Sequence, residues 1–290
     1  MTIDIKQAVH RVLSTAGIPI NPVVLSPSQA GNPMSFYQSM DFSDIEKVQA
    51  GLDSFVQMLV NGKCRAFVVS GPAGSSKTSS TTSLLKRYSP TSCVHISGTL
   101  SPIMVYIKMY RHSNPGEVIV LDDVDSLYKS LEGMNVIKAA TDSGPKRMVS
   151  WLTANPLLKA WGIPNTFEFK GGMVLISNES MNSKKGSKLS VHMKAIADRL
   201  YHIPMGTDDK EEQFHQLCYY VVKQGMLRAR GLSPKQESEI LQYITDHYDR
   251  LPNITLRTAT KLADLMQQAP SEWEALADLS LLEKKHIEIF

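Results

Sequence analysis

A stretch rich in glycine and serine, GPAGSSKT at residues 71–78, carries the groups needed to hold a phosphate. It follows an apolar run (66–70) and precedes a helix-compatible run (78–88). A turn between a strand and a helix directs backbone N–H groups at one point, where the helix dipole adds positive potential. Lys77 offers a mobile cation for the outer phosphates of a nucleotide, and Thr78 offers a hydroxyl ligand for magnesium. The alternative is an ordinary Gly/Ser-rich turn.

The predicted phosphate-binding residues are Gly71, Pro72, Ala73, Gly74, Ser75, Ser76, Lys77 and Thr78. One of them, Ser76, stands where such loops normally carry glycine. Serine keeps a backbone N–H that can donate to a phosphate, but it adopts a positive φ less easily than glycine does. A positive φ would place strain of about 1–3 kcal/mol on the site, whereas a helical φ would cost almost nothing. The sequence is compatible with both.

Polar side chains follow two further apolar runs. Asp122 and Asp123 end the run EVIVLDD, and Asn178 follows the run GMVLIS. Ligands of an open parallel sheet bind at the carboxyl ends of its strands, so both acids would face the loop if the two strands are neighbours. Asp122 would then hold magnesium, Asp123 would orient or deprotonate an attacking water, and Asn178 would contact the γ-phosphate and that water. The alternative for the two acids is that one of them only caps the following helix, although Asp125 is better placed for that role. The alternative for Asn178 is that it only forms a turn.

Two arginines occupy positions of interest further along the chain. Arg199 ends a short helix-compatible stretch, ADRL, before the last apolar run, and Arg257 lies early in a later helical stretch. A single arginine is more often an exposed or ion-paired residue. For these two arginines, a functional interpretation is supported by their order along the chain relative to the loop and to the polar residues at the strand ends.

The order of these elements resembles that of the AAA+ ATPase family over about residues 42–270. By this resemblance, the loop is the Walker A motif, VIVLDD is Walker B and Asn178 is the sensor-1 residue. Arg199 is similar to the arginine finger that reaches a neighbouring subunit, and Arg257 to the sensor-2 residue that binds nucleotide. The resemblance implies ATP and Mg²⁺ at subunit interfaces of a homo-oligomeric ring, usually a hexamer. It also implies catalytic roles for Lys77, Asp123, Asn178 and Arg199, with Thr78 and Asp122 holding the metal.

Two residues depart from the family pattern. Ser76 replaces glycine, and Asp123 replaces the commoner glutamate. The Asp-Asp pair resembles the branch of the family that contains DnaA and the helicase loaders. An aspartate reaches less far than a glutamate, so slow turnover is one expectation.

The elements that must position these residues follow from hydrophobic patterning. Apolar runs at 66–70, 93–97, 117–123 and 172–177, with a weaker one at 200–205, alternate with helix-compatible stretches. This alternation predicts an α/β fold with a five-stranded parallel sheet. A helix is expected from near Ser43, with SDIE as its capping signature. The predicted organisation is an N-terminal helix and strap (1–41), the α/β nucleotide-binding domain (42–207), and a helical lid domain with a C-terminal tail (208–290).

Composition restricts the functional classes. The chain has 290 residues, a net charge of +3, 42% hydrophobic residues and three widely spaced cysteines, which form no CxxC pair. The N-terminus lacks the apolar core of a signal peptide, and no stretch approaches 18 apolar residues. These features predict a cytoplasmic protein without a membrane partner.

Basic and aromatic residues bear on the partner on which the protein acts. A basic stretch at 181–194 contains Lys184, Lys185 and Lys188, and exposed Trp161 follows Lys159. Such residues suit single- or double-stranded DNA, although a solvated lysine loop is the simpler interpretation. We expect Trp151 to be buried and Tyr106 to pack within a helix. The prediction is a ring-forming ATPase acting on DNA in replication, recombination or helicase loading. The alternatives are an ATPase resembling the MoxR group that remodels a protein client, and an ATP-binding assembly factor with little hydrolysis.

Overall fold

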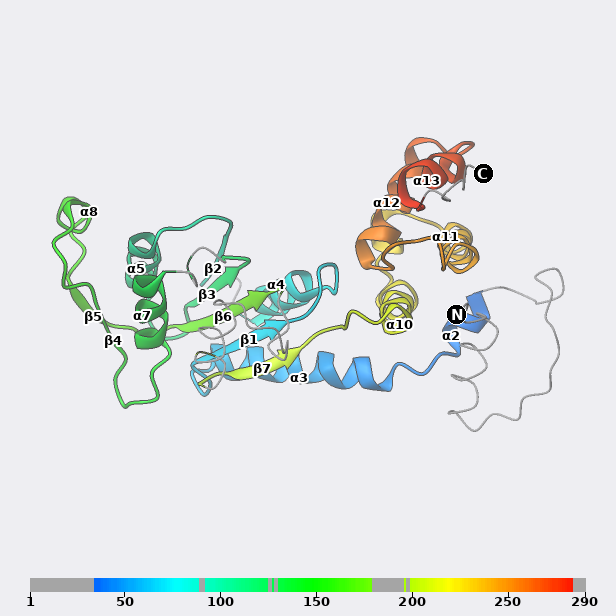
Figure 1. Ribbon diagram of the computed structural model, residues 1–290. Helices are drawn as coiled ribbons and strands as arrows, with labels where there is room; N and C mark the ends of the chain where they lie inside the picture. The colour runs from blue at the N-terminus through cyan, green and yellow to red at the C-terminus, as the bar shows by residue number, and fades with distance from the viewer. Residues whose placement is uncertain are drawn as a thin grey trace. The chain divides into compact units, whose positions relative to one another are not determined.

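The computed structural model describes residues 34–88, 92–124, 127, 130–178, 196 and 199–283. The chain divides into two units, Met1–Ser39 and Met40–Phe290. The described part of the first unit, residues 34–39, contains helix α2 (Met34–Gln38). The predicted helix near the N-terminus, the lysine stretch with Lys184, Lys185 and Lys188, and Asp125 lie outside the described residues. The elements below belong to the second unit (Figure 1).

A five-stranded parallel sheet organises the first part of this unit, which confirms the predicted α/β fold. The strand order is β2-β3-β6-β1-β7, so that β6 lies between β1 and β3. The strands are β1 (Ala66–Ser70), β2 (Cys93–Ser97), β3 (Val118–Asp122), β6 (Gly172–Ser177) and β7 (Tyr201–Pro204). Strands β1, β3 and β6 are buried along their whole length, as their nearly continuous apolar sequences predict.

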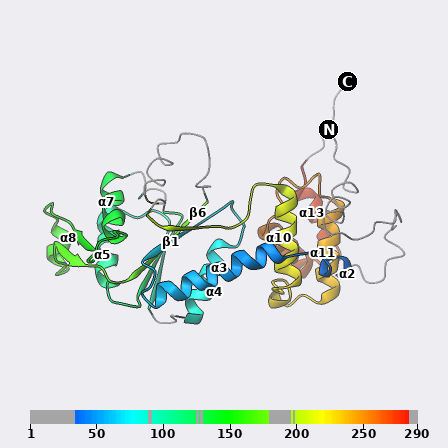
Figure 2. The same ribbon diagram turned by 90° about the horizontal axis from the view of Figure 1, so that it is seen from below.

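Helices cover both faces of the sheet (Figures 1 and 2). Helices α3 (Ser43–Val60) and α4 (Lys77–Tyr88) pack on the face that carries Phe67 and Val69. Helices α5 (Pro102–Arg111) and α7 (Leu131–Ala140) pack on the opposite face, which carries Val68. The alternation of these β1 side chains follows from the period of two in a strand. Strands β1, β3 and β6 therefore each contribute to two cores.

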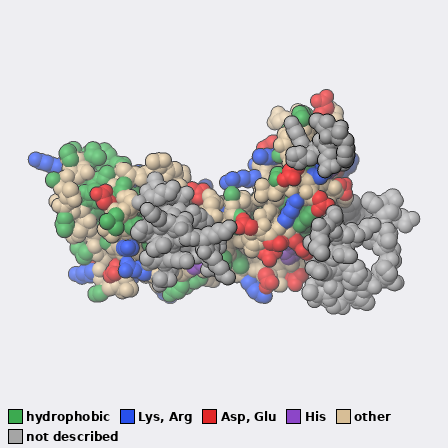
Figure 3. Space-filling model, viewed as in Figure 1, with side chains coloured by type: hydrophobic (Ala, Val, Ile, Leu, Met, Phe, Trp, Pro, Cys, Tyr) green, Lys and Arg blue, Asp and Glu red, His purple; other side chains and the backbone are tan. Residues whose placement is uncertain are grey.

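The segment between β3 and β6 forms a small antiparallel sheet that the sequence did not indicate. It consists of β4 (Met148–Ser150) and β5 (Thr166–Glu168), with the short helix α8 (Pro156–Ala160) between them. Tyr106 of α5 is fully buried, as expected, whereas Trp151, which was expected to be buried, is only half-buried against it. Trp161 is 45% exposed, also as expected, and the Arg111 guanidinium lies 5.1 Å from its ring centroid. Hydrophobic side chains are visible on the surface of this part of the molecule in Figure 3.

Among the described residues after β7, all regular secondary structure is helical. They are α10 (Lys210–Val222), the short 3-10 helix η1 (Arg228–Arg230), α11 (Pro234–Asp246), α12 (Leu256–Gln268) and α13 (Trp273–Leu281). Ser233 and Gln236 form a capping box at the start of α11. No helix in the described ranges has both the length and the apolar character needed to cross a bilayer.

The structure corrects the start of one helix. Helix α3 begins at Ser43, but Phe42 is its N-cap and no side-chain capping bond forms, so the SDIE capping signature was wrong. The Ser43 N–H instead binds the Asp41 carboxylate at 2.9 Å, which occupies the donor that a capping box would use. Thr255 is the N-cap residue of helix α12.

Candidate functional site

The loop at residues 71–78 connects β1 to α4 and is tightly surrounded. A Cβ on Gly71 would lie 1.9 Å from the Met205 carbonyl oxygen, and one on Gly74 would lie 2.8 Å from Thr255 Cβ. Glycine is therefore required at both positions for packing. Within the described part of the chain, the backbone N–H groups of residues 74–78 find no protein acceptor. A turn of unpaired N–H groups at the start of a helix is an anion-binding arrangement.

The structure decides the backbone question at Ser76. Its φ is 71°, so the serine adopts the left-handed conformation that glycine accepts more easily. The described residues contain one other non-glycine residue with a positive φ, and this is Asp123 at 52°. Backbone strain of this kind persists where surrounding contacts enforce it, and it concentrates at functional sites. The sequence had already indicated both residues as site residues, Ser76 in the phosphate-binding loop and Asp123 as the base.

The Lys77 side chain is buried beneath the loop. Its ammonium donates to the Gly71 and Pro72 carbonyls at 2.8 and 2.7 Å and to Asn178 Oδ1 at 2.9 Å. Burial lowers its pKa, while the charges of Asp123 and Asp122 oppose this shift. The cation is therefore held by oxygens that an anion could replace.

Asp122 lies at the end of β3 and meets the start of α4. The Thr78 hydroxyl donates to Asp122 Oδ2 at 2.9 Å, and His95 Nε2 lies 2.9 Å from the same oxygen. The strands β1 and β3 are not neighbours, because β6 separates them. The contact forms nonetheless, since Thr78 lies in the first turn of α4 rather than on β1. A hydroxyl and a carboxylate at this distance are suitable oxygen ligands for Mg²⁺.

Asn178 links Lys77 to Asp123. Its amide nitrogen lies 2.7 Å from both Asp123 carboxylate oxygens, while its oxygen accepts from Lys77. Both Asp123 and Asn178 are exposed. Asp123 is thus an oriented carboxylate that solvent can reach, which is what general-base chemistry requires.

The two arginines differ in position. Arg257 lies in the first turn of α12, and its positive charge contributes to lowering the pKa of Lys77, so it lies within electrostatic range of the loop. Arg199 is exposed in the turn before β7, and its backbone N–H donates to Ile196. Among the described residues, its side chain makes no hydrogen bond or ion pair with the other predicted site residues.

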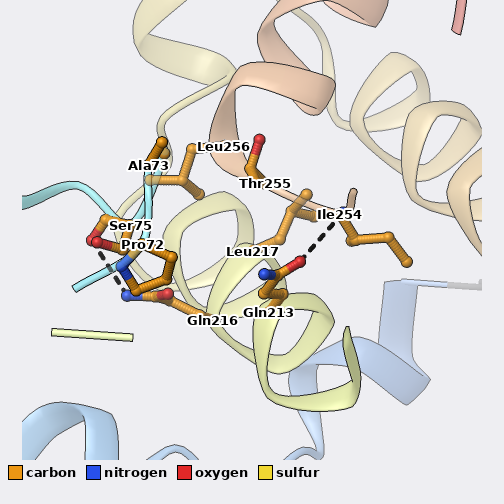
Figure 4. Close-up of a pocket in the computed structure, with 10 residues that line it drawn as sticks. Pro72, Ala73, Ser75, Gln213, Gln216, Leu217, Ile254, Thr255 and Leu256 are labelled. Carbon is orange, nitrogen blue, oxygen red and sulfur yellow. Dashed lines mark hydrogen bonds between the residues drawn. The ribbon is translucent and has the colours of Figure 1, made fainter. Parts of the chain in front are cut away.

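Helices α10 and α12 contact the loop on the side away from the ends of β3 and β6 (Figure 4). Gln216 Nε2 donates to the Ser75 carbonyl at 3.2 Å, and the Leu256 N–H donates to the Gly74 carbonyl at 3.4 Å. The cavity between the loop and the helices has a volume of about 10 Å³, which is room for one water molecule. We call the residues of α10 and of the start of α12 that lie against the loop or bond Ser80 just after it the helical wall: Gln216, Tyr220, Thr255 and Leu256.

The sequence did not single out three residues of the site. His95 alternates with apolar residues in β2, and only the pairing of β2 with β3 brings it to Asp122. Gln216 and Tyr220 are spaced by one turn along α10, which indicates a shared face but not its partner. Their position next to the loop is a result of tertiary packing.

Comparison with known proteins identifies a relative. An uncharacterized 36.7 kDa protein from the nrdC-mobD intergenic region of Enterobacteria phage T4 is 31% identical over 224 residues, which cover 76% of this chain and 69% of the phage protein. The chain belongs to the family of this phage protein. No protein-family model matches it.

Solved structures with a similar arrangement share little sequence with this member of the phage family. They include the replication initiator DnaA bound to AMPPCP and single-stranded DNA (12% identity, TM-score 0.47, covering 89% of this chain and 70% of DnaA). Domain III of Thermotoga maritima DnaA has 13% identity and a TM-score of 0.46, covering 92% and 100%. The Thermotoga maritima RuvB Holliday junction branch migration motor has 12% identity and a TM-score of 0.45, covering 81% and 68%. Because all three TM-scores are below 0.5, functional conclusions rest on the site of this chain.

Proposed function

We propose that this chain is an ATP hydrolase of the AAA+ type that works on DNA as an assembled ring. The observation that supports ATP binding is the meeting of Lys77, Thr78, Asp122, Asp123 and Asn178 beside unpaired backbone N–H groups. A cation, a metal-binding oxygen pair and an oriented base are the groups that phosphoryl transfer requires.

The residues fit a magnesium–nucleotide complex. Thr78 and Asp122 would hold the metal, which would neutralise charge on the phosphates when bound. The described residues offer few metal-binding side chains here, which suits a metal whose coordination phosphate and water oxygens complete. Lys77 would exchange the Gly71 and Pro72 carbonyls for phosphate oxygens, and the N–H groups of residues 74–78 would donate to the same phosphates.

The Asn178–Asp123 pair supplies the water-activating step. Asn178 holds the carboxylate by its amide nitrogen, so Asp123 can accept a proton from a water aligned with the γ-phosphate. The water oxygen forms a bond to the γ-phosphorus, and the bond from that phosphorus to the bridging oxygen of ADP breaks. Arg257 would add positive charge from α12.

The proposal of a ring is based on Arg199, which is exposed and whose side chain bonds none of the other site residues in the described part of the chain. A cation supplied by a neighbouring subunit would stabilise the transition state only after assembly. Arg199→Ala should leave ATP binding intact and stop hydrolysis. Mixing it with Asp123→Asn chains should restore activity at mixed interfaces, and no recovery at any ratio would rule out the action of Arg199 on a neighbour.

The ATPase assay should be run with single-stranded DNA, double-stranded DNA and no DNA, at protein concentrations that permit assembly. The proposal expects Mg²⁺-dependent phosphate release that DNA accelerates. Turnover that is insensitive to DNA would favour remodelling of a protein client. Binding without turnover would favour the assembly factor, a second candidate supported by the positive φ of both Ser76 and Asp123.

A further inference from the structure

The Ser76 side chain begins a series of hydroxyl groups that leads from the loop to α10. Ser76 Oγ lies 2.5 Å from Ser80 Oγ, one turn along α4, and Ser80 Oγ lies 3.1 Å from the Tyr220 hydroxyl. Gln49 of α3 donates to the Tyr220 oxygen at 2.8 Å. Because Tyr220 accepts this bond, its own hydrogen is available to Ser80, and the Ser80 hydrogen is then available to Ser76.

Ser76 is held from its backbone as well. Its carbonyl accepts from the Ser80 N–H at 2.9 Å and from the Ser79 hydroxyl at 3.1 Å. These bonds explain how a serine remains at φ 71°. A glycine would adopt this conformation with less strain, but it has no side chain to offer Ser80. The departure from the usual glycine therefore adds a connection to α10.

The α10 end of the series is buried. Tyr220 is 9% exposed, and burial raises the pKa of its hydroxyl, so the group stays protonated and able to donate. A buried hydroxyl that loses its hydrogen-bond partner destabilises the folded protein. Movement of α10 away from the loop would separate Tyr220 from Ser80, so this movement is opposed. The neighbouring Tyr219 offers a contrast, since its hydroxyl accepts from Gln224 and not from the loop.

We propose that Ser76 is a positioning residue that couples the loop to α10 through Ser80 and Tyr220, so that retention of bound nucleotide depends on α10. This inference rests on the proposed ATP site. Ser76 would act through the loop backbone, whose N–H groups bind the phosphates. Loss of either terminal hydroxyl would loosen the loop, so that nucleotide leaves sooner.

The test is a double-mutant cycle with Ser76→Ala and Tyr220→Phe, which remove the terminal hydroxyls and keep the remaining side chains. The readout is the dissociation rate of a fluorescent ATP analogue in the assembled protein. Each single variant should release the analogue roughly three- to tenfold faster, the size expected for one hydrogen bond. The double variant should be no faster than the singles, because both break one connection. The ATP concentration for half-maximal rate should rise while kcat changes less than about twofold.

Tyr219→Phe is the matched control, with an expected change below about twofold. Two results would overturn the coupling. One is that Tyr219→Phe raises the dissociation rate as much as Tyr220→Phe does. The other is that the effects of Ser76→Ala and Tyr220→Phe on this rate multiply in the double variant. Ser76→Gly separates the hydroxyl from the backbone strain. Coupling predicts faster release from Ser76→Gly despite its relaxed backbone, whereas slower release than from wild type would show a strained residue without a positioning role.

The same cycle, measured on the unfolding equilibrium constant without nucleotide, separates two kinds of failure. Wild-type protein that binds no analogue would refute the proposed ATP site. Analogue binding without coupling in either cycle would refute the hydroxyl series alone.

Discussion

The 71–78 loop lies between two unlike regions. The ends of β3 and β6 provide chemical groups, with Asp122, Asp123 and Asn178 arranged around Lys77. The helical wall provides amide and backbone N–H contacts to loop carbonyls and a hydroxyl contact to Ser80 in the first turn of α4. Under the proposed function, this difference corresponds to a division of labour, in which the strand ends would perform the chemistry and the helices would hold the loop in place. Variants on the sheet side should therefore change catalytic rate, and variants on the helical side should change affinity and stability.

The largest effect should come from Asp123→Asn. Removing the base should lower kcat by roughly 10²- to 10⁴-fold, with ATP affinity nearly unchanged. Asparagine tolerates a positive φ, so the backbone at 52° should be retained. The measurement is phosphate release beside a nucleotide titration. Asp44→Asn, at an exposed position of α3, is the control, and a wild-type kcat in Asp123→Asn would remove Asp123 from the reaction.

A smaller effect should come from Gln216→Ala on the helical side. The variant loses the bond to the Ser75 carbonyl, which should lower the free energy of unfolding by about 0.5–1.5 kcal/mol and weaken ATP binding severalfold. The rate per bound nucleotide should not change. Urea unfolding and steady-state kinetics measure both, with exposed Gln268→Ala as the control. A kcat loss as large as that of Asp123→Asn would erase the distinction between the two regions.

The smallest effect concerns pH. Burial lowers the pKa of His202 on β7 and of His215 on α10 below the ordinary value of 6.5. The unfolded chain thus binds protons that the folded chain excludes, so the free energy of unfolding should fall as the pH drops below about 6.5. Urea unfolding between pH 7.5 and 5 measures this slope. His202→Gln and His215→Gln should each flatten it, and an unchanged slope in the double variant would contradict the assignment.

The sequence predicted the sheet side better than the helical side. The runs at 66–70, 93–97 and 172–177 match β1, β2 and β6. For β1 and β6 the reason is that buried strands of a parallel sheet are nearly continuous in apolar residues. The residues at their ends meet because parallel strands place their carboxyl ends at one edge. The strand order was not predictable, and β6 separates β1 from β3.

Features set by tertiary contacts were beyond sequence reasoning. The β4–β5 pair has only three residues in each strand, too few for a clear alternation. Tyr220 lies 140 positions from Ser80, and no local pattern indicates that contact. The φ of Ser76 likewise depends on its surroundings. The predicted boundary of a helical lid domain at residue 208 and the roles of Arg199 and Arg257 remain predictions.

The most direct test of the central claim is calorimetric titration with a non-hydrolysable ATP analogue, with and without Mg²⁺. Wild-type protein should bind one analogue per chain, more tightly with Mg²⁺. Lys77→Ala should weaken binding at least roughly 100-fold, since it removes a buried cation from the phosphates. Lys86→Ala, at an exposed position of the same helix, should bind as wild type does. Lys77→Ala protein that keeps wild-type affinity would contradict the assignment of residues 71–78 as a nucleotide-binding loop.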